Sequence, residues 1–143
     1  MLDRLFIYGT LLAVAEHPMG DLLRTAGRFV GVGSIQARLY VIDDPDAPGQ
    51  NAYPGAVPSP DPADQVHGEI WAVHDPAIWP RLDAFEACSE DWPEPHEFLL
   101  RAVEVRMEDG SLLPARSYLY TWDVRTAQHL PDGRYAVASA GVV

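Results

Sequence analysis

The sequence contains no lysine: its positive side chains are ten arginines, set against 21 acidic residues, and the formal net charge is −11. The absence of lysine excludes a phosphate-loop lysine and a Schiff-base lysine. The excess of negative charge disfavours nucleic acid and anionic membrane surfaces as binding partners. We therefore expect neither nucleic acid nor a membrane among the partners of this protein.

Cysteine is equally scarce. Cys88 is the single cysteine, which excludes an intrachain disulfide and a zinc site built from several cysteines. Of the five histidines, only His67 and His74 are close in sequence, and their spacing fits no standard zinc motif. A nucleophilic pair of Cys88 with His96 is one alternative, but a lone cysteine is more often a small buried apolar group. We expect no metal site.

Long apolar runs are also absent. None approaches the ~18 residues of a membrane span. The short apolar run within residues 1–14 follows Asp3 and Arg4 and has no clear cleavage site, so it does not resemble a signal peptide. A chain of 143 residues that is 48% apolar and 22% charged is typical of one globular domain, here residues 1–143. We expect a cytoplasmic protein and leave its oligomeric state open.

Strand-like segments outnumber helical ones. Gly31 and Gly33 predict a bulge or a sharp bend, and Asp109-Gly110 predicts a two-residue hairpin turn. The proline-rich residues 43–64 predict a long loop that lines a functional site. We expect strands at residues 5–8, 28–42, 66–73, 98–107 and 112–122, and helices at residues 18–26 and 75–87.

This pattern favours the α+β class, with a small and strongly bent mixed or antiparallel sheet that closes into a β-barrel and a few short helices. A doubly wound fold is disfavoured, because strands and helices do not alternate regularly.

Tyr8-Gly9-Thr10-Leu11 stands where the first apolar strand stops. Glycine lets the backbone turn there, and successive backbone N–H groups at such a turn can bind an anion. The Thr10 hydroxyl adds one more hydrogen-bonding group. The alternative is an ordinary turn at the end of a strand.

Leu82-Asp83-Ala84-Phe85-Glu86 lies on the second predicted helix. Ile78, Leu82 and Phe85 form an apolar stripe, and Glu86 falls on or beside it. Partial desolvation and the nearby Asp83 would raise the pKa of Glu86 toward neutrality, as a general acid/base requires. The alternative is a glutamate at the solvated edge of the helix.

Together the two motifs resemble the γ-glutamylcyclotransferase family. Three weaker matches follow in the order of that family: Tyr53-Pro54-Gly55-Ala56-Val57 is similar to its Tyr-Pro-Gly loop, Val66-His67-Gly68-Glu69-Ile70 to its Val-x-Gly-Glu strand, and Tyr118-Leu119-Tyr120 to its late aromatic strand. The resemblance covers residues 5–122 and implies a small barrel with one cavity.

The resemblance also implies a reaction and its residues. The α-amine of a γ-glutamyl group attacks its own γ-carbonyl, which releases 5-oxoproline and a free amine or amino acid. Glu86 would be the general base and then the general acid, and residues 8–11 would hold the glutamyl group. Tyr53 and Tyr118 would line the site. The chemistry needs no metal and no organic cofactor, because ring closure is intramolecular.

The sequence departs from the family pattern after Glu86. Phe98 and Leu100 occupy the positions where the family often has Tyr-x-Arg. Loss of the arginine would weaken contacts to an anionic substrate there, so the leaving amine is left open. The alternative function is a non-catalytic or regulatory module that keeps the cavity and binds a small carboxylate. Glu69 is expected on a solvated face of its strand.

Overall fold

The computed structural model describes residues 3–8, 18–43, 49, 52–85 and 94–135. This part of the chain forms seven strands and two helices. In chain order they are β1 (Arg4–Ile7), α1 (Pro18–Ala26), β2 (Gly27–Asp43), β3 (Ala52–Pro58), β4 (Gln65–Val73), α2 (Ile78–Phe85), β5 (Phe98–Met107), β6 (Leu112–Tyr120) and β7 (Gln128–Leu130).

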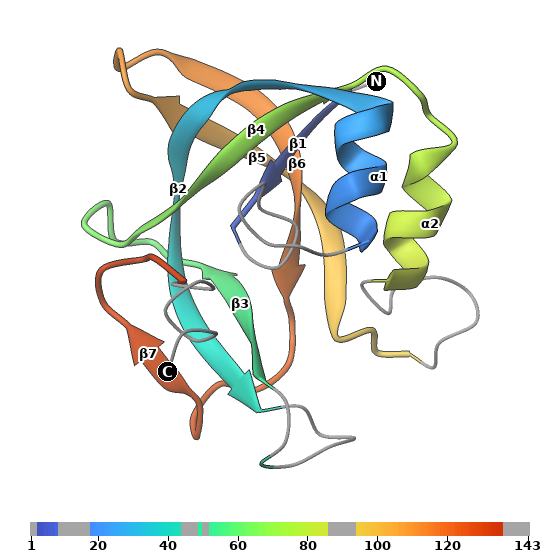
Figure 1. Ribbon diagram of the computed structural model, residues 1–143. Helices are drawn as coiled ribbons and strands as arrows, with labels where there is room; N and C mark the ends of the chain where they lie inside the picture. The colour runs from blue at the N-terminus through green and yellow to red at the C-terminus, as the bar shows by residue number, and fades with distance from the viewer. Residues whose placement is uncertain (1–2, 9–17, 44–48, 50–51, 86–93, 136–143) are drawn as a thin grey trace.

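Five strands close into a barrel. Strands β2, β4, β1, β6 and β5 are hydrogen-bonded in that order, and β2 pairs in addition with β5. The β1–β6 pair is parallel and the other barrel pairs are antiparallel. Strands β3 and β7 pair with the second half of β2, beyond the barrel, while α1 and α2 lie side by side on one flank (Figure 1). The predicted α+β class, with a small mixed barrel and few short helices, is confirmed.

The barrel closes at Gly33 of β2, which pairs with Met107 of β5. A Cβ atom at this position would lie 2.7 Å from the carbonyl oxygen of Arg106 and 2.7 Å from Cγ1 of Val105. Real Cβ atoms do not approach backbone this closely, so the absence of a side chain allows the two strands to meet. The glycine predicted to mark a bend therefore marks the seam of the barrel.

The predicted bulge and both helices are present, with one change of bounds. The register of β2 shifts between Phe29 and Gly31, which is the expected bulge. Helix α1 has the predicted bounds. Helix α2 begins at Ile78 rather than at residue 75, because Asp75 forms the cap that precedes it. Oδ1 of Asp75 accepts a hydrogen bond from the N–H of Ala77 at 3.1 Å.

Two predictions about loops are wrong. Residues 43–64 are not one long loop, because Ala52–Pro58 form β3 and pair with residues 37–43 of β2. The prolines that favoured a loop are tolerated because β3 is an edge strand. The β5–β6 hairpin has a three-residue loop, which Met107 closes with a 2.8 Å bond from its N–H to the carbonyl of Ser111. Gly110 takes the left-handed conformation of such loops, with φ 88°.

The barrel wall separates two apolar cores, because successive strand residues point to opposite faces. We call the first the barrel core; its buried members come from strands and from the residue after β1, and they include Phe6, Tyr8, Ile70 and Leu119. The second, the helix-side core, joins strand residues to both helices. It includes Leu23 of α1 and, from α2 and β6, Ile78, Trp79, Leu82, Tyr118 and Tyr120. Both faces of β6 are therefore buried near its end.

Candidate active site

Tyr8 follows β1 directly and is the first of residues 8–11, the predicted substrate-binding segment that we call the cradle. Its ring lies in the barrel core and is 7% exposed. The hydroxyl donates a hydrogen bond to the carbonyl of Tyr118 at 2.5 Å and accepts one from the N–H of Ala56 at 3.2 Å. Both bonds are buried, where unsatisfied polar groups would be costly. The end of β1 is thus attached to β6 and to β3.

Tyr118 extends this connection to helix α2. Its side chain points to the helix-side core, and its hydroxyl donates a 2.7 Å hydrogen bond to Oδ1 of Asp83. Asp83 is half-buried and lies on α2 one turn beyond Trp79. A carboxylate acceptor makes this bond stronger than a bond between neutral groups. The contact fixes α2 against β6 near the last described residue of the helix.

Four sequence motifs therefore meet in one chain of hydrogen bonds. It runs from Ala56 of the Tyr-Pro-Gly segment to Tyr8, from Tyr8 to Tyr118, and from Tyr118 to Asp83. These residues are separated by up to 110 positions in sequence. The structure thus brings together Tyr8 and Tyr118, two of the predicted site residues.

A second group of aromatic side chains lies next to this chain. Tyr53 donates a hydrogen bond through its hydroxyl to Oε2 of Glu97, and its ring centroid is 6.0 Å from that of Phe98. The rings of Phe98 and Tyr120 meet edge to face, with centroids 5.2 Å apart. Gly55 packs against the Tyr120 ring, since a Cβ added to it would lie 3.0 Å from that side chain. Strand β3 therefore contacts both groups.

The surroundings of Tyr120 are acidic. Burial, followed by the carboxylates of Glu97 and Asp123, raises the pKa of the Tyr120 hydroxyl to about 12. The hydroxyl is therefore protonated at neutral pH. A hollow of about 320 Å³ adjoins the ring. It is lined by Val41, Ile42, Asp43, Ala52, Tyr120, Asp123, Thr126, Ala127 and Gln128.

Phe98 and Leu100, at the positions of the family's Tyr-x-Arg, both lie on the helix-side face of β5. Phe98 is 6% exposed and pairs with Tyr120 across the strands. Leu100 is half-buried and pairs with Tyr118. The strand beside Tyr118 is therefore apolar at both positions.

Glu69 is less solvated than the sequence predicted. It is half-buried and pairs with Ile7 at the end of β1. Its Oε1 accepts a 3.0 Å hydrogen bond from the indole N–H of Trp71. Glu69 and Trp71 lie on the same face of β4, and Trp71 belongs to the helix-side core. The expectation of a solvated face is corrected accordingly.

The remaining predicted residues cannot be placed. Gly9, Thr10, Leu11, Glu86 and Cys88 lie outside the described residues. Their assigned roles stay predictions.

Two residues of the site were not found from the sequence in the role that they have. Asp83 was considered only as a neighbour of Glu86, whereas it is the acceptor for Tyr118. Glu97 was not singled out, although it binds Tyr53. The sequence feature that could have indicated the role of Asp83 is its position on α2, directly after the buried Leu82. No local signal marks Glu97, because its partner is 44 positions away.

Two features are absent from the described residues. No group of three or more histidine, cysteine, aspartate or glutamate side chains within them is arranged to hold a metal ion. None of the helices in this part of the chain is long and apolar enough to cross a membrane.

Comparison with solved structures identifies the fold. The chain superposes on allophanate hydrolase from Kluyveromyces lactis with a TM-score of 0.69 at 14% identity, over 100% of this chain and 22% of the other. For an uncharacterized protein from Pyrococcus horikoshii the TM-score is 0.60 at 17% identity, over 97% and 94% of the two chains. For a structure named gamma-glutamyl cyclotransferase it is 0.60 at 19% identity, over 85% and 68%. The chain therefore spans about a fifth of the allophanate hydrolase and most of the Pyrococcus protein.

No curated protein matches the chain. The family described as "Gamma-glutamyl cyclotransferase, AIG2-like", in contrast, matches residues 5–137, which include all five motifs. The chain belongs to this AIG2-like family of gamma-glutamyl cyclotransferases.

Proposed function

We propose that the protein cleaves a γ-glutamyl amide by intramolecular cyclisation. The α-amine of the substrate attacks its own γ-carbonyl, the bond to the leaving nitrogen breaks, and the products are 5-oxoproline and a free amine. Family membership supports this reaction class. The sites that would carry it are Tyr8 to Leu11 for substrate binding and Glu86 for proton transfer.

One observation carries the proposal: the hydrogen bonds from Tyr8 to Tyr118 and from Tyr118 to Asp83. Asp83 precedes Glu86 by three residues in the sequence. A chain segment held at Asp83 against Tyr118 is therefore held near the end of β1. This is the proximity that an acid/base following α2 in the chain and a cradle after β1 require.

Glu86 is the proposed general base and general acid. Its carboxylate takes a proton from the attacking nitrogen and delivers a proton to the leaving nitrogen. The carboxylate is therefore ionised again at the end of the reaction. One carboxylate can serve both nitrogens, because they are bonded to the same carbon in the tetrahedral intermediate.

The backbone of residues 8–11 is the proposed site for the glutamyl group and for the developing oxyanion. Fixed N–H donors stabilise such an oxyanion without reorganising during the reaction. The two hydrogen bonds of the Tyr8 hydroxyl anchor the start of this segment. Tyr53 and Tyr118 are the proposed aromatic lining.

The second candidate function is a module that binds a small carboxylate without turnover. The apolar pair Phe98 and Leu100 favours it, because a polar contact expected from the family is missing there. Release of 5-oxoproline separates the two candidates, because only a catalyst releases it.

The test is a panel of γ-glutamyl compounds that differ in the leaving amine, with 5-oxoproline measured by chromatography. We expect release from at least one compound and loss of that release in Glu86→Gln, which keeps the side-chain shape. Binding of glutamate to Glu86→Gln should remain. Normal turnover by Glu86→Gln would contradict the role of Glu86. Full activity of Cys88→Ala would eliminate a cysteine nucleophile.

A further inference from the structure

The hollow of about 320 Å³ beside Tyr120 has no part in the proposed reaction. Its lining comes mainly from the end of β2 and from the segment that connects β6 with β7, and β7 pairs with β2 next to it. None of the residues to which the proposed reaction assigns a role is in this lining. Ligand sites in proteins have volumes from about 300 Å³ upward. The hollow is therefore large enough to hold a small organic molecule.

Tyr120 brings a polar group without a partner to the wall of this hollow. The residue is only 6% exposed, and its ring packs edge to face against the rings of Phe98 and Trp122. Within the described part of the chain, its hydroxyl makes no hydrogen bond. The hydroxyl of a buried tyrosine usually has a partner. A polar ligand in the hollow would supply one, because a hydroxyl can both donate and accept.

Carboxylates make the surroundings of this hydroxyl negative. Asp43 and Asp123 line the hollow, and the charges of Glu97 and Asp123 are close enough to Tyr120 to raise the pKa of its hydroxyl further than burial alone does. Hydrogen bonds from the backbone N–H and from Nε of Arg125 lower the pKa of Asp123, which is therefore ionised at neutral pH. None of the described residues that line the hollow is basic. The ligand that this site favours is therefore a cation.

The rest of the lining indicates which kind of cation fits. The carboxylates here belong to no group of three or more potential ligands that is arranged to hold a metal ion among the described residues. Val41, Ile42 and Ala127 add apolar surface beside the carboxylates. An ammonium group donates three hydrogen bonds and accepts none, which matches carboxylate and hydroxyl oxygens as partners. An alkyl chain attached to it matches the apolar part of the lining.

We propose that the hollow binds a small primary alkylammonium ion, with the charged group beside Asp123 and the Tyr120 hydroxyl and the alkyl chain against Val41 and Ala127. This site is independent of the proposed reaction, because the two share no residue. Hydrogen bonds from an ammonium to a carboxylate are stronger than bonds between neutral groups. The net charge of −11 on the chain also attracts a cation from solution.

The experiment compares pentylammonium with pentanol, a neutral molecule of the same chain length, on the wild-type protein at neutral pH. Calorimetry gives the two affinities, and NMR of the backbone amides of Ala127 and Gln128 locates the site. We expect pentylammonium to shift these signals and to bind about 10- to 100-fold more tightly than pentanol. Equal affinities would show that the hollow selects by apolar contact alone, which would overturn the proposal. The same shifts with magnesium chloride would indicate a counter-ion only and would overturn it as well.

Asp123→Asn removes one charge and keeps the shape of the side chain, so it should lose most of the preference for pentylammonium over pentanol. Asp109→Asn in the β5–β6 loop is the matched control and should keep the wild-type preference. Both aspartates are exposed and accept a bond through Oδ1 from the backbone N–H two positions later, at 2.8 Å for Asp123 and 2.9 Å for Asp109. Tyr120→Phe should weaken the binding of pentylammonium about 3- to 10-fold. A preference that survives in Asp123→Asn, or that falls equally in Asp109→Asn, would contradict the site.

Discussion

Tyr118 donates its hydroxyl hydrogen to Oδ1 of Asp83 at 2.7 Å, while its carbonyl accepts a bond from Tyr8. One residue of β6 therefore joins the end of β1 to helix α2. The proposed site depends on this junction, because the cradle follows Tyr8 in the chain and the proposed acid/base follows Asp83.

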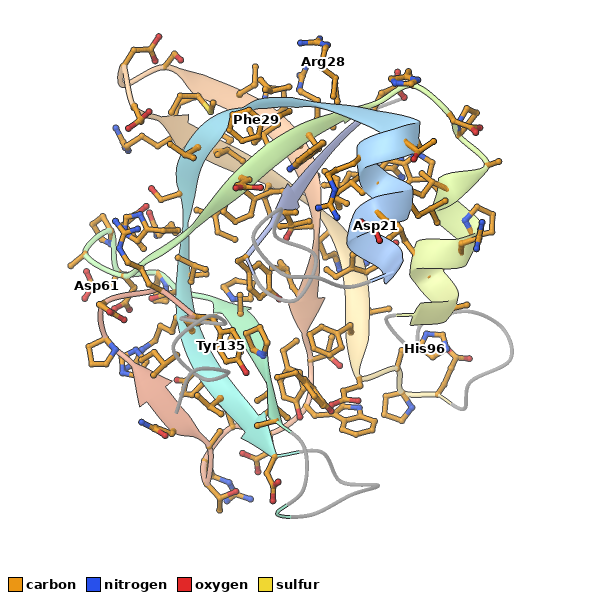
Figure 2. The ribbon with its side chains drawn as sticks, viewed as in Figure 1. Asp21, Arg28, Phe29, Asp61, His96 and Tyr135 are labelled. Atoms are coloured by element: carbon orange, nitrogen blue, oxygen red, sulfur yellow. The ribbon has the colours of Figure 1, made fainter. Side chains whose placement is uncertain are left out.

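The junction predicts coupling between Tyr118 and Asp83. Tyr118→Phe and Asp83→Ala should each lower the free energy of unfolding, and their double variant should lose less than the sum, with a coupling energy of about 0.5–3 kcal/mol. Urea denaturation of the four proteins measures it. The matched cycle of Tyr118→Phe with Asp61→Ala, an exposed aspartate of the β3–β4 turn (Figure 2), should be additive. Additivity in the first cycle would show that the hydrogen bond contributes nothing.

Tyr8→Phe should destabilise the protein by about 1–3 kcal/mol, since it removes the buried acceptor of Ala56 and the donor to Tyr118. Tyr135→Phe is the control, because that hydroxyl makes one exposed bond to Ala52 at 3.3 Å and should change stability by less than about 0.5 kcal/mol. Urea midpoints at constant m-value give both numbers. Equal effects of the two substitutions would contradict the assigned role of Tyr8.

Gly33→Ala should destabilise the barrel by about 1–3 kcal/mol, because its Cβ would overlap the backbone of Arg106 at the seam. Gly31→Ala in the same strand is the matched control. Its Cβ would meet only Cε of Met107, the mobile end of a flexible side chain, at 3.0 Å. Thermal unfolding should therefore separate the two variants clearly. A barrel that tolerates both equally would mean that β2 and β5 are less closely paired than described.

Stability should fall at high pH through Tyr120. The pKa of its hydroxyl is raised from 10.0 to about 12 in the folded protein, mainly by burial. The neutral hydroxyl thus stabilises the fold fully below pH 10, and this contribution is lost as the pH rises through 12. Tyr120→Phe should flatten the decline of unfolding free energy in this window. The measurement belongs in a Tyr135→Phe background, because burial also raises the pKa of Tyr135. An unchanged decline would refute the assignment.

Much of the fold could be predicted from local patterns. The apolar run at residues 5–8 and the alternation within β4, β5 and β6 marked strands, since burial of one or both faces leaves a periodic signal. Strand β3 was missed because Pro54 and Pro58 suggest a loop, and only its edge position makes them compatible with a strand. A bulge or sharp bend was predicted at Gly31 and Gly33, but the pairing of Gly33 with β5 is a long-range relation that no local pattern encodes.

Two of the predicted site residues, Tyr8 and Tyr118, were chosen from separate motifs, and the structure joins them directly through a hydrogen bond. Glu97 could not be chosen in the same way, because its significance comes from its hydrogen bond with Tyr53 on another element.

The most direct test of the account is the rate of 5-oxoproline release by Glu86→Gln on the best compound of the panel. General acid/base catalysis predicts a decrease of about 10²- to 10⁴-fold in kcat/KM, with glutamate binding retained. Glu104→Gln, the same change at an exposed glutamate of β5, should keep the wild-type rate. Equal rates in Glu86→Gln, Glu104→Gln and wild type would contradict the account.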